Sequence, residues 1–90
     1  MVTEIVIIPL ALEKMRLRGI PENWVRDAIV SPDDTMSGYG GRRVAQKTRQ
    51  VGGKSMMLRV VYERANKDYV VVTAYLTSRV ERYQRREHGD

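Results

Sequence analysis

Cysteine is absent from this 90-residue chain, and histidine occurs only once, as His88 near the C-terminus. Without cysteine the chain cannot form disulfide bonds, thiolate zinc sites or a cysteine nucleophile. No group of His, Asp and Glu residues has the spacing of metal ligands. We therefore expect no cofactor and no metal site.

The chain also lacks long apolar runs, and none approaches the roughly 20 residues that a membrane helix needs. Its start, MVTEIVIIPLAL, has no basic segment before the apolar residues and carries Glu4 and Pro9, unlike a secretory signal peptide. We expect a cytoplasmic protein with no membrane partner.

The composition is that of a folded domain, with 42% hydrophobic and 30% charged residues. A chain of this length forms one domain and buries roughly 60–65% of the surface exposed when unfolded, which gives a modest core. A homodimer would add buried surface. We expect a single domain over residues 1–78 and a basic C-terminal tail over 79–90.

The order of apolar and turn-forming residues predicts one strand, two helices and three further strands. The β-branched residues 3–9 favour a strand, Pro9 is well placed to open a helix, and Gly19 to end it. Pro21 opens a second helix that stops before Pro32, and a turn-rich loop follows. The later strands are expected at 42–50, 55–64 and 69–77, joined by turns at VGGK and ANKD.

Alternation along the strands predicts an α+β fold, β-α-α-β-β-β, with both helices on one face of a curved antiparallel sheet. On the other face, Arg59, Thr73 and Tyr75 converge, and we expect Lys47 and Arg49 to join them. The residues expected in the core between helices and sheet are Trp24, Ile29, Leu58, Val60, Val72 and Ala74.

Basic residues are concentrated in GGRRVAQKTRQVGGK, residues 40–54, which contains no acidic residue. Its five cations equal the net charge of the whole chain, +5. Three uses are open: protection of an edge strand against aggregation, contact with phosphates, or contact with an acidic partner. The candidate nucleic-acid-binding residues are Arg42, Arg43, Lys47, Arg49 and Lys54.

The segment ALEKMRLRGIPENWVRDAIVSPD resembles the opening of a small uncharacterised bacterial family placed near the BrnT-type toxins. The element order is similarly that of the RelE/ParE-type toxin fold. LRVVYE and YVVVTAYLT resemble the last two strands of the family, so the likeness covers about residues 5–77. The residues that carry the motif are Ala11, Lys14, Met15, Arg18, Gly19, Ile20 and Pro32.

The resemblance implies a toxin–antitoxin protein that binds RNA or the ribosome, or a metal-independent endoribonuclease. Such cleavage needs a base near the 2′-hydroxyl, an acid for the leaving oxygen and cations around the phosphate. The candidate catalytic residues are Arg59, Tyr75 and Lys47, and Tyr39 is a further candidate for stacking on a base or donating a proton.

One position departs from the family, whose members commonly have His directly before the helix's first Ala. This chain has Leu10 there, so we expect weak cleavage or none. The alternative is a non-catalytic protein-binding module of the same fold, whose basic sheet receives an acidic segment of an antitoxin.

Overall fold

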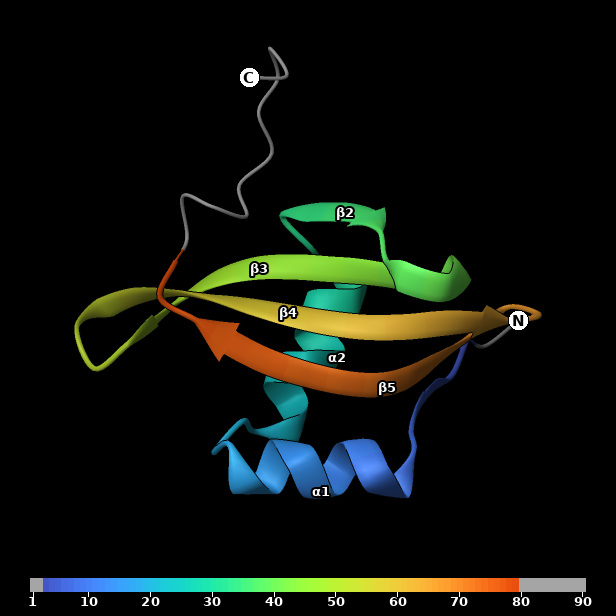
Figure 1. Ribbon diagram of the computed structural model, residues 1–90, viewed down its shortest axis with the longest axis horizontal. Coiled ribbons are helices and arrows are strands. Elements are labelled where there is room, and N and C mark those ends of the chain that lie inside the picture. The colour runs from blue at the N-terminus through green and yellow to red at the C-terminus, as the bar shows by residue number, and fades with distance from the viewer. Residues whose placement is uncertain (1–2, 80–90) are drawn as a thin grey trace, which may run out of the picture.

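The computed structural model describes residues 3–79 and shows two helices packed against a five-stranded sheet (Figure 1). The strands lie in the order β1-β5-β4-β3-β2. The predicted α+β class is therefore confirmed. The elements are β1 (Ile5–Ile7), α1 (Pro9–Leu17), α2 (Glu22–Val30), β2 (Asp34–Ser37), a 3₁₀ turn η1 (Tyr39–Gly41), β3 (Arg43–Val51), β4 (Lys54–Ala65) and β5 (Asp68–Thr77).

Both helices begin and end close to the residues predicted to delimit them. Pro9 is the first residue of α1, where its missing N–H costs no helical hydrogen bond. Gly19 follows the helix with a φ of +67°, a left-handed conformation that glycine adopts without the strain of a side chain. Pro21 stands directly before α2, which ends at Val30.

Strands β3, β4 and β5 form the predicted antiparallel sheet. The β3–β4 turn has two residues, since Val51 pairs with Lys54. Gly52 and Gly53 have φ values of +58° and +76°, as a two-residue hairpin with right-handed twist requires. This turn sets the register of the whole hairpin, so that Gln46 lies opposite Arg59 and Lys47 opposite Leu58.

Two features of the sheet differ from the prediction. Strand β2 lies within the segment expected to be a loop, and it pairs antiparallel with β3. Asp33 secures its start, because its backbone N–H donates to Gln46 O and its carboxylate accepts the N–H of Thr48, both at 2.8 Å. Strand β1 pairs with β5 in parallel, so the complete sheet is mixed rather than antiparallel.

The core forms between the helices and one sheet face. Ile29, Leu58, Val60 and Ala74 are buried as predicted, and Trp24 is half-buried against this cluster. The prediction for Val72 was wrong. A β-bulge pairs Val61 with Thr73 but Tyr62 with Val71, which leaves Val72 without a partner and turns Val71 into the core at 0% exposure.

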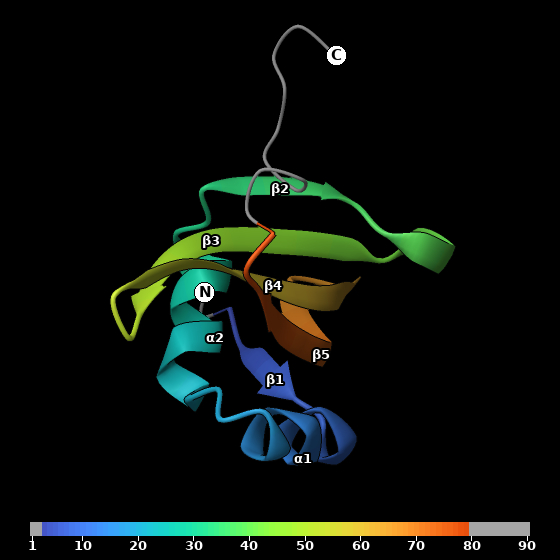
Figure 2. The ribbon, with the colours of Figure 1, turned by 60° about the vertical axis from the view of Figure 1, so that its left-hand side comes forward.

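The curved sheet bends around the helices, and both lie on the same side of it (Figure 2). Helix α1 packs mainly against β5, and α2 against β3 and β4. No described helix covers the opposite face of β3, β4 and β5 (Figure 1). The side chains on that face are therefore not covered by a helix of residues 3–79. The predicted basic tail, apart from Arg79, lies outside the described residues.

Candidate nucleic-acid interface

Arg59 lies at the centre of the uncovered sheet face. Its neighbours across the sheet are Gln46 on β3 and Tyr75 on β5. The guanidinium donates from Nε to Gln46 Oε1 at 2.7 Å and from Nη1 to the hydroxyl of Tyr75 at 2.6 Å. Because the N–H groups of arginine point in fixed directions, these two contacts set the plane of the group.

Two further contacts help to hold the guanidinium of Arg59 in this orientation. Nη2 lies 3.6 Å from the sulfur of Met36, and the guanidinium carbon is 5.7 Å from the centre of the Tyr75 ring. Gln46 is only 1% exposed, so its side-chain oxygen has a single well-defined position. The guanidinium is therefore held in one orientation rather than moving freely in solvent.

A groove of about 450 Å³ opens beside Arg59 on this face. Its floor comes from the central strands and its rim from the connection between β2 and β3. That volume is in the range of about 300–1,000 Å³ found for small-ligand sites, enough for part of a polymer chain. The lining residues are Ser37, Gly38, Tyr39, Arg42, Val44, Arg59, Val61 and Tyr75.

The rim is a tight turn over residues 38–42. The backbone N–H of Gly38 donates to Arg42 O at 2.6 Å, which closes the turn. A side chain at Gly38 would lie 3.1 Å from Arg42 O and 3.2 Å from a methyl carbon of Val44, so the position has little room. Tyr39 follows and is 96% exposed.

Arg42 is the second cation of the groove. Its Nε lies 2.8 Å from a carboxylate oxygen of Glu63, and both side chains are about half exposed. An exposed pair of this kind contributes about 0–1 kcal/mol, so a phosphate can compete with Glu63 for Arg42.

Lys47 and Arg49 do not lie with Arg59, which corrects the prediction that they share its face. They pair with Leu58 and Met56 and therefore point to the helix side. Both contact Asp27 of α2, with Nζ of Lys47 at 3.0 Å and Nη1 of Arg49 at 3.6 Å from the same oxygen. Lys47 also donates to Ser31 O at 2.8 Å.

The remaining cations of the basic segment are dispersed. Arg43 lies opposite Tyr62, on the helix side, and is exposed. Lys54 is exposed at the tip of the β3–β4 hairpin. Of the five predicted nucleic-acid-binding residues, the structure places only Arg42 in the groove. Of the three predicted catalytic residues, it brings Arg59 and Tyr75 together and puts Lys47 on the far side.

Gln46 is the site residue that the sequence interpretation missed. A signal for it was present, because counting outward from the two-glycine turn pairs Gln46 with Arg59. The buried amide supplies the acceptor that orients the guanidinium. Met36, which also contacts Arg59, could not be assigned because β2 was expected to be a loop.

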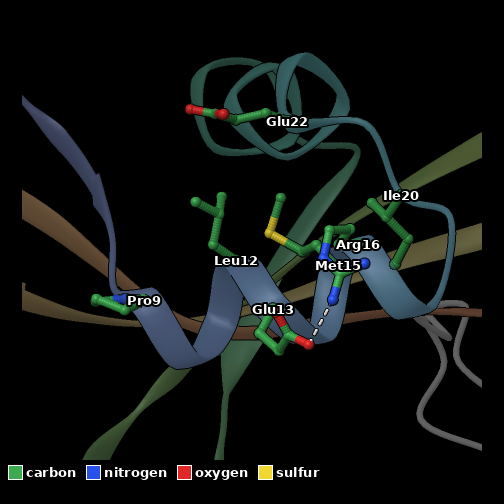
Figure 3. Close-up of a pocket in the computed structure, with 7 residues that line it drawn as sticks. All are labelled: Pro9, Leu12, Glu13, Met15, Arg16, Ile20 and Glu22. Carbon is green, nitrogen blue, oxygen red and sulfur yellow. Dashed lines mark hydrogen bonds and ion pairs between the residues drawn. The ribbon is translucent and has the colours of Figure 1, made fainter.

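A second hollow, of about 410 Å³, lies between α1 and the start of α2 (Figure 3). Leu12, Met15 and Ile20 contribute apolar atoms to it. Arg16 at its edge is paired with Glu13 at 2.6 Å. This hollow is mainly apolar and does not offer the convergent polar groups of the Arg59 groove.

Within residues 3–79, no three His, Cys, Asp or Glu side chains are grouped so that they could hold a metal ion. None of the helices in the same range has the length and apolarity needed to cross a bilayer. The chain matches no known family model, no curated protein and no solved structure.

Proposed function

We propose that this chain is an RNA-binding domain of the RelE/BrnT type, which contacts RNA with the uncovered sheet face. The observation that carries the proposal is the Arg59 guanidinium, oriented by Gln46 and Tyr75 beside an open groove. Arg42 adds a second cation at the rim. The motif resemblance of residues 11–32 supports the same class, and a cytoplasmic location belongs to the proposal.

Phosphate recognition follows from the charges in the groove. Arginine binds phosphate through two parallel N–H bonds, so an RNA phosphate would share the guanidinium of Arg59 with its present contacts to Gln46 and Tyr75. If an RNA phosphate replaced Glu63 as the partner of Arg42, Arg42 would contact a neighbouring phosphate of the RNA backbone. The apolar atoms of Val44 and Val61 beside these cations lower the local dielectric, which strengthens the attraction.

Binding is better supported than cleavage. Tyr75 holds its hydroxyl against Arg59, where it could donate a proton to a leaving oxygen. Among the described residues, the groove lining includes no histidine, carboxylate or lysine to accept the proton of a 2′-hydroxyl, and Lys47 is on the other face. We therefore expect slow metal-independent cleavage at most, with Tyr75 as acid.

Salt dependence of RNA binding tests the proposal. The affinity of a 12-nucleotide single strand should fall with salt, since each neutralised phosphate releases counterions. Arg42→Ala should weaken binding and reduce the log–log salt slope by about 0.7. Arg16→Ala is the matched control, because Arg16 is also exposed and paired with a carboxylate but lies on α1.

Two outcomes would contradict RNA binding by the groove. Salt-independent affinity, or equal losses from both substitutions, would place binding elsewhere. Tight capture of an acidic protein without any RNA binding would favour the protein-binding alternative. A parallel incubation with EDTA tests cleavage: cyclic 2′,3′-phosphate ends that disappear with Tyr75→Phe would assign the acid.

A further inference from the structure

Tyr39 is the most exposed of the large apolar side chains in the described residues, at 96%. It makes no hydrogen bond or ring contact through its side chain within residues 3–79, so it contributes little to the core there. An aromatic ring placed in water at the rim of a polar groove is unusual for a structural residue, because burial of such rings is a main source of stability. The ring is therefore accessible to a ligand in the groove.

The turn holds Tyr39 in place despite this exposure. Gly38 N–H donates to Arg42 O at 2.6 Å, and Arg42 N–H donates to Tyr39 O at 3.3 Å. Gly40 and Gly41 follow with φ values of +66° and +82°, which turn the chain sharply back towards β3. The backbone of Tyr39 is thus fixed by local bonds, and a ligand would not have to order a flexible loop.

We infer that Tyr39 is a stacking platform for one unpaired base, and that the ligand is single-stranded rather than duplex RNA. The inference rests on the proposed function of the same groove. Every base has a flat face that stacks on an aromatic ring, whereas a base inside a duplex already stacks on its neighbours. A strand with phosphates at Arg59 and Arg42 could place an adjoining base on the Tyr39 ring, which lines the same groove.

Charge and shape agree with this class of ligand. The groove combines cations with tyrosines, the combination by which proteins bind single strands with little sequence preference. A volume of about 450 Å³ leaves room for part of one strand beside Arg59 and Tyr39. We expect the affinity to depend little on base identity, since stacking contacts the flat face of a base and not the hydrogen-bonding groups at its edge.

Fluorescence anisotropy with labelled RNA tests the inference, with matched single-stranded and duplex oligonucleotides. Tyr39→Ala and Tyr39→Leu should weaken single-strand binding by about 5- to 150-fold, the range for loss of one base–aromatic stack. Tyr39→Phe should stay within about twofold of the original chain, because the ring remains. Leu17→Ala is the control, since Leu17 is also strongly exposed but lies on α1, away from the groove.

Each result decides between the two proposals. Equal single-strand binding by the Ala, Leu and original forms would overturn the role of Tyr39 and leave RNA binding by the groove intact. Duplex binding as tight as single-strand binding would overturn the ligand class. Absence of salt-dependent binding by the original chain to either RNA would overturn the proposed function itself. Far-UV circular dichroism should show that all four variants remain folded.

Discussion

The ammonium nitrogen of Lys47 lies 3.0 Å from a carboxylate oxygen of Asp27, and the same oxygen is 3.6 Å from Nη1 of Arg49. The carboxylate of Asp27 on α2 thus forms ion pairs with two cations of β3. The guanidinium of Arg49 also lies over the Trp24 ring, at 4.3 Å from its centre. These contacts tie the middle of the basic segment to α2, on the face opposite to Arg59.

Asp27→Asn should therefore destabilise the fold. The substitution leaves Lys47 and Arg49 close together without their shared negative charge, and both are mostly buried. Because Asp27 itself is about half exposed, we expect a loss of about 1–2 kcal/mol in the free energy of unfolding, measured by urea denaturation. Glu13→Gln, which removes an exposed partner of Arg16, should change it by no more than about 1 kcal/mol. Equal effects would mean that the Asp27 cluster is only a surface feature.

The bulge in β5 predicts different costs at two neighbouring valines. Val71 is fully buried, whereas Val72 is half-buried on the bulge. Val71→Ala should cost about 2 kcal/mol through lost burial and the cavity left behind. Val72→Ala should cost less than about 1 kcal/mol. Thermal or urea unfolding of both variants compares them, and a larger cost at Val72 would refute the register.

Glu63→Gln should increase RNA affinity. It frees Arg42 from its ion pair and removes a negative charge beside the groove. Since exposed pairs contribute at most about 1 kcal/mol, the expected gain is up to about fivefold in Kd at low salt.

Glu13→Gln serves as the control for that experiment because it changes the net charge equally but releases Arg16 on α1. A gain of the same size in both variants would show only a general effect of net charge. Unchanged or weaker binding by Glu63→Gln would exclude Arg42 as a phosphate contact.

Local signals in the sequence predicted much of the fold. Pro9 and Gly19 delimit α1 because each suits a backbone conformation found at a helix end. The Gly52–Gly53 turn produces the β3–β4 hairpin for the same reason. Such features depend on a few neighbouring residues, and the sequence displays them directly.

The missed features depend on contacts between distant segments. Strand β2 has four residues and no clear alternation, and it exists because β3 offers it an edge. The bulge at Val72 is a property of the β4–β5 pairing and leaves no mark in the local pattern. Lys47 and Arg49 lie on the helix side because the hairpin register pairs them with Leu58 and Met56, whereas alternation within β3 alone does not say which face of the sheet they share.

We propose that RNA contacts the sheet face that carries Arg59 and not the cations beside α2. Titration of the ¹⁵N-labelled chain with a single-stranded RNA, followed by two-dimensional amide NMR, tests it residue by residue. We expect the largest shifts over residues 38–44 and at Arg59 and Tyr75. Shifts concentrated at Asp27 and Lys47, with the groove unchanged, would contradict it.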